Sequence, residues 1–313
     1  MRRFLALART ATVESLAEPL AAVLFLSGLS LVHLAPAFHY HQFGEAGRLA
    51  RECGFSALLV FGLVFATAAA VRTVGRELES GTAAVALALA VPRPLFLAAR
   101  ITGVLAALLL FAVAVACATA LSYASAVIAA FLRAEQGVSV QAWGPGLAAG
   151  VCFTLGAFAL AAAANRFLRA RFCWTACLLM AVAQPLALCV ASLVGGGLPL
   201  SLPGFFRPFM DFLPAFAALS AGCAVFVVFA GALATRLRQA TVTACVAVAI
   251  VLSFVHPLRA ILPDINRFWL VDRLANGGTL GWCDVMPALA AGALMSVFWL
   301  VAGSVLLVRR EIP

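Results

Sequence analysis

The chain has 313 residues, of which 65% are hydrophobic and 11% are charged, and its formal net charge is +9. Soluble domains carry about 25% charged residues, so this composition excludes a soluble globular protein. Apolar stretches of bilayer-spanning length recur along the sequence. They predict an all-α, polytopic membrane helical bundle that forms a single domain over 1–313, and not a β-barrel, whose strands are about 10 residues long with alternating polarity.

Every basic side chain in this sequence is arginine, because lysine does not occur. A phosphate-binding loop of the G-x-x-x-x-G-K-[ST] kind needs its lysine on the terminal phosphates. The chain is therefore not expected to bind ATP at a standard site. Its nine cysteines are scattered without a C-x-x-C pair, which favours buried small hydrophobes over a disulfide framework or a metal site.

Residues 1–18 are predicted to form an interfacial helix. Arg9 interrupts the first apolar stretch after only five residues, which argues against a cleaved signal peptide. The arginines of this segment would meet anionic headgroups of the lipid bilayer. The residues expected on its other side are Phe4, Leu5, Ala8 and Thr12.

Eight membrane crossings are predicted from the apolar runs. The third run would measure about 48 Å as a helix, so it must tilt, protrude or break near Ser122-Tyr123-Ala124-Ser125. The seventh follows a very short turn, and a hairpin that fails to span there would reduce the count to six. The eight runs are 19–38, 54–71, 101–132, 147–164, 172–194, 212–235, 240–255 and 286–308.

Three connections between these crossings have distinct compositions. Residues 39–52 are polar and predict a loop. Gly195-Gly196-Gly197 and the prolines that follow predict an irregular or re-entrant outer segment over Ser201–Phe209. Residues 257–284 predict an outer loop whose aromatic side chains suit the headgroup level, namely Phe268, Trp269 and Trp282. A kink is expected at Pro185 in the fifth crossing.

The arginines predict the orientation of the bundle. With the N-terminus inside, 14 of the 21 arginines fall in inner segments and 7 in outer segments. This twofold bias agrees with the positive-inside rule. Both termini are therefore expected in the cytoplasm, and the membrane is expected to be the bacterial cytoplasmic (inner) membrane.

Residues 72–94 stand out between the second and third crossings. The segment opens with four charged residues, passes through Ser80-Gly81-Thr82, and continues as an apolar run that ends at Pro92-Arg93-Pro94. A run of about 10 residues covers about 15 Å, half of the roughly 30 Å needed to span a bilayer. Such a helix lies in the membrane interface or in a groove of another protein. Ser80 or Thr82 could cap it.

Catalytic and ion-coupling chemistry has few candidates in this sequence. The predicted crossings contain no Asp, Glu or Arg except at their edges, whereas ion-coupled carriers keep ionisable groups at membrane depth. His33 is read as a packed polar side chain. His39 and His41 are read as surface histidines, because a metal would need further ligands. No serine has a histidine and an acid at a telling spacing.

The stretch GRELESGTAAVALALAVPRPLFLAARITG, 75–103, resembles the segment between the second and third spans of type-2 ABC exporter permeases. The shared pattern is a charged turn, E-x-G-T, a short apolar helix, a proline stop and an aromatic-leucine restart, here Phe96-Leu97. TATVESLAEPL near the N-terminus is similar to the interfacial helix of that family. INRFWLVDRLANGG near the C-terminus resembles the ending of one bacterial subgroup, although that family usually has six spans.

The resemblance implies that 72–94 is a cytoplasmic coupling segment seated in a cleft of a separate cytosolic ABC ATPase, which would hold ATP and Mg. It also implies that two permeases, identical or paralogous, pair in the membrane. No nucleic acid partner is expected. The residues implied to couple to the ATPase are Arg72, Arg76, Glu77, Glu79, Ser80, Gly81, Thr82, Pro92 and Arg93.

Three other functions remain alternatives: a non-transporting polytopic scaffold or assembly factor, a membrane enzyme acting on lipid or isoprenoid, and a secondary carrier. Copurification of a cytosolic ATPase, turnover by the purified chain alone and response to an imposed proton gradient would discriminate among them. The leading hypothesis is a permease subunit that is not itself an enzyme. The substrate is not determined by the sequence.

Overall fold

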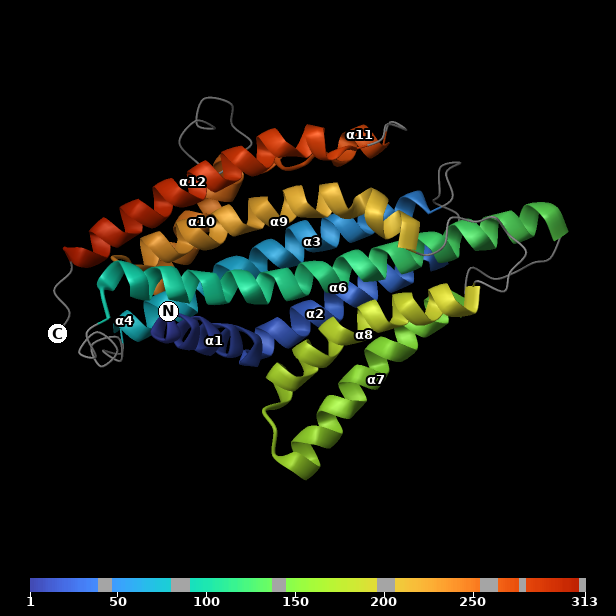
Figure 1. The fold of residues 1–313 in the computed structure, drawn as a ribbon, viewed down its shortest axis with the longest axis horizontal. Helices are drawn as coiled ribbons and strands as arrows, with labels where there is room; N and C mark the ends of the chain where they lie inside the picture. Colours follow the sequence, from blue (N-terminus) through green and yellow to red (C-terminus); the bar gives the residue numbers. More distant parts are fainter. Residues whose placement is uncertain are drawn as a thin grey trace.

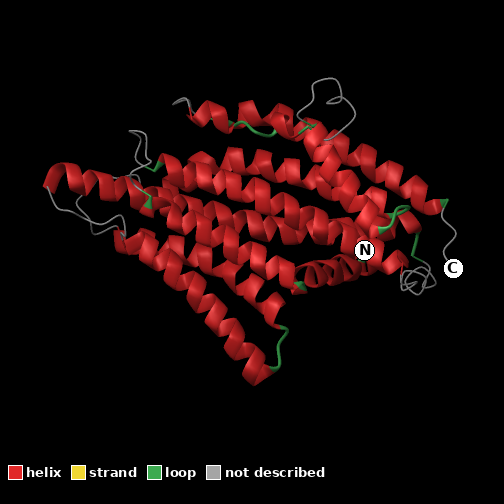
Figure 2. Ribbon diagram, turned by 180° about the vertical axis from the view of Figure 1, so that it is seen from behind, coloured by secondary structure: helices red, strands yellow, loops and turns green. Residues whose placement is uncertain are grey.

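The computed structural model describes residues 1–38, 47–79, 91–136, 145–195, 206–253, 264–275 and 280–309. Within these ranges every regular element is a helix, and short loops join several of them (Figure 2). Seven of the described helices are long and apolar enough to cross a membrane. The predicted all-α membrane bundle is confirmed at this level.

The seven long helices have the following bounds. They are α2 with the 3-10 turn η1 (Pro19–Leu34, Ala35–Ala37), α3 with its continuation (Arg48–Glu79), α6 (Arg93–Gln136), α7 (Pro145–Leu168), α8 (Phe172–Gly195), α9 (Phe206–Ala234) and α12 (Trp282–Val308). The continuation of α3 (Arg48–Ala70) consists of the π-helical turn η3 (Val71–Arg76) and α4 (Glu77–Glu79). The shorter elements are α1 (Arg2–Ala17), α10 (Gln239–Leu252), η5 (Ile265–Arg267) and α11 (Val271–Ala275).

Helices α2, α3, α6, α9 and α12 run along the long axis of the molecule, whereas the α7–α8 hairpin diverges from the others towards its turn (Figure 1). The first residues of α1 lie against Val91 and Pro92, and Arg93 contacts the last turn of α12. Glu79 lies at the start of α10. We call this end of the bundle, where α1 begins and α12 ends, the base.

The core is centred on α3, α6 and α9. Phe25 from α2 meets Phe111 from α6 with ring centroids 4.9 Å apart, and Phe55 from α3 meets Phe216 from α9 at the same separation. Helices α3 and α6 pack closely at Gly54, where an added Cβ would overlap the side chain of Thr119. Small residues at helix contacts let backbones approach closely in membranes, where packing drives association.

The third crossing neither breaks nor ends near its serines. Helix α6 has 44 residues, about 66 Å at 1.5 Å per residue, and it projects beyond its neighbours at the end opposite the base (Figure 1). Ser125 donates to the carbonyl of Leu121 within the helix at 2.7 Å. Of the three predicted possibilities, the break is excluded and the helix protrudes.

The seventh predicted crossing is shorter than expected. Helix α10 has 14 residues, about 21 Å, so it does not reach across a bilayer of about 30 Å by itself. The described chain resumes at Asp264, and Asn266 donates to the carbonyl of Ser253 at the end of α10. Phe268, expected at the headgroup level, is buried between Gly222 of α9 and Gly292 of α12, and its depth in the membrane stays a prediction.

Two local predictions are corrected by the helix bounds. Residues 39–52 were expected to form a loop, but α3 already begins at Arg48. Residues 201–209 were expected to be irregular, but α9 begins at Phe206, and 201–205 lie outside the described residues. Leu5 is 56% exposed, and α1 packs on the bundle through Ala11, Ser15 and Leu16. Helix α8 contains Pro185 and does not end there.

We predict that Gly54→Ala destabilises the bundle by about 1 to 3 kcal/mol, because the new methyl group overlaps Thr119 and forces α3 and α6 apart. Thermal unfolding of the purified protein in detergent measures the effect. Gly156→Ala in α7 is the matched control, because an added Cβ there meets no atom within 4 Å. Equal melting temperatures for the two variants would contradict the predicted role of close α3–α6 packing.

Candidate functional site

The predicted coupling segment is described at its two flanks only. Ser80, Gly81 and Thr82 lie outside the described residues, as does the apolar run to Ala90. The first flank, expected to be a charged turn, is helical and continues α3 through η3 and α4. The second flank is Val91–Pro92, and α6 begins at Arg93, so the predicted proline stop coincides with a helix boundary. Both flanks lie at the base (Figure 1).

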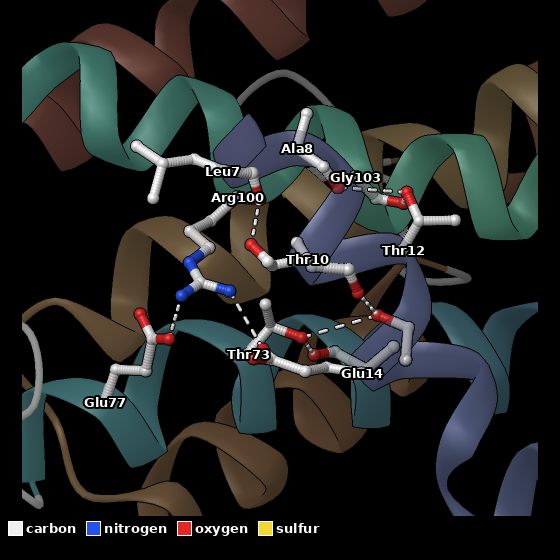
Figure 3. A network of polar contacts seen from close by, with 12 residues as sticks. Leu7, Ala8, Thr10, Thr12, Glu14, Thr73, Glu77, Arg100 and Gly103 are labelled. Atoms are coloured by element: carbon white, nitrogen blue, oxygen red, sulfur yellow. Dashed lines mark hydrogen bonds and ion pairs between the residues drawn. The ribbon is translucent and has the colours of Figure 1, made fainter. Parts of the chain in front are cut away.

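A buried arginine joins the first flank to two other elements. Arg100, in the second turn of α6, is 5% exposed. Its guanidinium forms ion pairs with Glu77 of α4 and with Glu14 of α1, the latter at 2.8 Å (Figure 3). The guanidinium carbon lies 5.7 Å from the ring centroid of Phe96. One side chain therefore holds α1, α4 and α6 together, and we call Arg100, Glu14 and Glu77 the base cluster.

Arginine suits this position because its planar fork presents several N–H donors in fixed directions and remains charged when buried. The paired groups are unequally accessible, with side-chain exposures of 7% for Arg100, 17% for Glu77 and 49% for Glu14. Bonds to a partly buried carboxylate are less screened than those at an open surface. The Arg100–Glu77 contact is accordingly expected to contribute more to stability than the Arg100–Glu14 contact.

Helix α1 is fixed to α6 by a second, polar contact beside this cluster. Thr12 donates to the backbone carbonyl of Gly103 at 3.0 Å (Figure 3). A Cβ on Gly103 would overlap Ala8 and Ala11, so the glycine allows α1 to lie directly on the α6 backbone. Ser15 of α1 lies 3.4 Å from Thr73 of η3, hydroxyl to hydroxyl. The predicted interfacial helix is thus packed on the base of the bundle.

The two flanks of the predicted coupling segment also form hydrogen bonds with the ends of other helices. Glu79 accepts a hydrogen bond from the backbone N–H of Gln239, the first residue of α10, at 3.1 Å. Arg93 donates to the carbonyls of Leu307 at 3.2 Å and Val308 at 2.8 Å, in the last turn of α12. An acid at a helix N-terminus and a base at a C-terminus both complement the helix dipole and satisfy groups that lack a partner within their helix.

The other charged residues of the first flank differ in their contacts. Arg72 pairs with Glu18 at the end of α1. Arg76 is exposed and makes no ion pair with a described residue, so the pairing of Arg76 with Glu79 that their spacing allows does not occur. Four of the predicted residues, Arg72, Glu77, Glu79 and Arg93, therefore bind within this chain. The sequence did not single out Arg100 or Glu14, although a lone arginine at the edge of an uncharged run is a recognisable signal.

A second polar group lies inside the bundle, away from the base. His33 of α2 is 1% exposed. Its Nε2 donates to Gln184 Oε1 of α8 at 3.0 Å, and its Nδ1 lies 3.3 Å from the hydroxyl of Ser122 in α6. Gln184 donates in turn to Thr154 of α7 at 2.7 Å, and Gly150 leaves room for the imidazole. These side chains serve as hydrogen-bond partners for one another and link four helices. This agrees with the role of a packed polar side chain that was predicted for His33. His39 and His41 lie outside the described residues.

Comparison with protein-family models, with curated proteins and with solved structures gave no match. The class of the protein therefore follows from its fold: it is a multi-pass helical membrane protein. Ion pairs occur at the base, as between Arg100 and Glu77, and at the opposite end, as between Arg273 and Asp284. Among the described residues no group of three His, Cys, Asp or Glu side chains could hold a metal ion.

We predict that Arg100→Gln lowers the apparent melting temperature by about 5 to 10 °C, because it removes the positive charge that pairs with the largely buried Glu77 carboxylate. Arg207→Gln is the control, since its pair with Asp211 is exposed and 4.0 Å long, and a shift below about 2 °C is expected. Adding Glu77→Gln to Arg100→Gln should recover part of the loss. A double variant no more stable than Arg100→Gln would show that charge pairing is not the cause.

We further predict a favourable coupling of about 0.6 to 1.7 kcal/mol between His33 and Gln184 in a double-mutant cycle with His33→Ala and Gln184→Leu. Unfolding in mixed micelles measures each free energy. The control cycle pairs His33→Ala with Thr102→Ala, whose hydroxyl is exposed and bonds only within α6, and should give no coupling. Equal values for both cycles would contradict a specific network.

Proposed function

We propose that this chain is the membrane-spanning permease subunit of an ATP-driven export system, and that a separate cytosolic ATPase of the ABC class docks on residues 72–94. The ATPase would hold ATP and Mg and hydrolyse the nucleotide. The permease would carry the substrate path and perform no chemistry of its own. A bacterial cytoplasmic membrane, with the base on its cytoplasmic side, is the proposed location.

One observation carries this proposal. The two flanks of residues 72–94 are anchored to different helices, with Glu79 on the start of α10 and Arg93 on the end of α12. Glu77 adds a bond through Arg100 to α1 and α6. A force applied to the part of the chain between Glu79 and Arg93 would therefore reach four helices through short polar contacts. This is the mechanical arrangement that a bundle driven by an external motor requires.

Three further observations support the proposal. The E-x-G-T pattern and the proline stop at Pro92 resemble those of type-2 ABC exporter permeases, and α6 begins at Arg93, three residues before the Phe96-Leu97 restart of that pattern. The absence of lysine from the whole sequence argues against a standard nucleotide site in this chain. The hydrogen-bonded state of His33 gives no support to a secondary carrier.

A second permease, identical or paralogous, is proposed as the partner within the membrane. Only 17% of the apolar membrane-spanning stretch of α12 is buried within the protein, and only 22% of that of α7. Their exposed sides would face lipid or the second permease.

We predict that Glu79→Arg abolishes copurification of the ATPase with the full chain from membranes of its native host, or weakens its stimulation at least about fivefold. Charge reversal would place repulsion where the partner is expected. Because Glu79 also binds the α10 N-terminus, the control is Gln239→Pro. This substitution removes the backbone N–H that donates to Glu79. Proline is tolerated at the first position of a helix, so α10 should still form and the ATPase should remain bound.

Two outcomes would count against the permease assignment. If no ATPase copurifies with the unmodified chain, the scaffold alternative gains support. If Glu79→Arg and Gln239→Pro weaken copurification equally, the effect comes from loosening α10, and residues 72–94 are not the docking segment.

A further inference from the structure

A half-open cavity of about 580 Å³ lies at the base, beside the base cluster. Its walls come from the C-terminal half of α1, the end of α3 with η3 and α4, and the turn between α7 and α8. The residues that line it are Glu14, Ser15, Ala17, Glu18, Ala69, Arg72, Thr73, Arg76, Glu77 and Arg171. It thus joins three parts of the chain that are distant in sequence.

The acids of this cavity are already paired, but two of its arginines are not. Glu18 pairs with Arg72, and Glu14 and Glu77 both pair with Arg100 behind the wall. Arg76 and Arg171 are exposed and make no ion pair with any described residue. Two guanidinium groups from separate elements therefore line one cavity, with their donors available for a ligand.

The backbone of the α7–α8 turn leads into this wall of the cavity. Arg169 adopts φ +53°, the left-handed region that non-glycine residues seldom occupy. The chain reverses there, with Ala170 donating to the carbonyl of Ala164 at 3.4 Å. Arg171 then lines the cavity, whereas Arg166, on the α7 side of the same turn, does not. Arg166 can therefore serve as a control for Arg171.

A shallow apolar depression of about 10 Å³ lies beside the cavity, on α2 and α3. It shares Ser15, Glu18, Ala69 and Arg72 with the cavity and adds four further residues, namely Leu20, Ala21, Phe65 and Ala68. Charged groups in the cavity thus lie next to an apolar surface. An amphiphile could place its anionic head in the cavity and lay an acyl chain along this surface.

We propose that this cavity binds the phosphate group of a membrane lipid, held by Arg76 and Arg171, with an acyl chain lying against the surface formed by Leu20 and Ala68. Guanidinium groups recognise phosphate through paired, charge-assisted N–H donors. Basic pockets between transmembrane helices at the cytoplasmic side are suited to anionic headgroups. The headgroup would rest between α1, the end of α3 and the turn of the α7–α8 hairpin. This inference rests on the proposed cytoplasmic side of the base and shares Arg76 with the proposed docking segment, but lipid binding by the purified chain does not require the ATPase.

The test uses the purified full-length protein in a neutral detergent and native mass spectrometry. The probes are dioctanoylphosphatidylglycerol, dioctanoylglycerol, which lacks the phosphate, and inorganic phosphate. The phosphatidylglycerol should bind, and Arg76→Gln or Arg171→Gln should each weaken its binding about tenfold, the loss expected for one charge-assisted contact. Arg166→Gln removes the same charge from an exposed position of the same turn and should change binding less than twofold.

A second variant separates the two sources of phosphate. Ala68→Phe places a bulky ring where the acyl chain would lie and should weaken binding of the phosphatidylglycerol without affecting inorganic phosphate. If inorganic phosphate binds in an arginine-dependent way and the phosphatidylglycerol does not bind, the cavity is an anion site and the proposal of a lipid ligand is overturned. Equal losses in Arg166→Gln and Arg171→Gln, binding of dioctanoylglycerol as tight as that of the phospholipid, or no loss in either cavity variant would overturn the proposal. Unchanged melting temperatures establish that the variants remain folded.

Discussion

A single buried guanidinium determines how the base of this protein is assembled. Arg100 enters the bundle at the start of a long apolar helix, where water cannot satisfy its donors. Its charge requires acids from elsewhere in the chain, and these come from α1 and α4. The position of the amphipathic N-terminal helix and the direction in which the second crossing leaves the bundle both follow from this requirement.

The need of polar groups for hydrogen-bond partners also explains why residues flanking the predicted coupling segment contact helix ends. A helix leaves N–H groups without partners at its start and carbonyls at its end. Glu79 serves the start of α10, and Arg93 and Arg236 serve three consecutive carbonyls at the end of α12. Charged residues that the family resemblance implies for an external partner thus have contacts within the chain. A segment with such contacts cannot shift without disturbing the helices that it caps.

The sequence predicted the long helices well, because a continuous apolar run is a local property. It placed the first, fourth, fifth and eighth crossings within a few residues of the observed bounds. It did not reveal features that depend on neighbouring helices. The glycines at positions 222 and 292 open a space in which the ring of Phe268 is buried between α9 and α12. Helix α10, with 14 residues, is too short to cross alone, although its composition is largely apolar.

The sequence by itself determined that the chain is a helical membrane protein, that a charged and then apolar segment separates its second and third crossings, and that its bases are all arginines. Only the tertiary structure decided which charges meet. Arg100 and Glu14 are 86 residues apart, and Arg93 and Val308 are 215 apart. Hydropathy is a property of each stretch alone. An ion pair between distant residues forms only when packing brings the two side chains within a few ångströms, and a local sequence pattern does not specify which side chains meet.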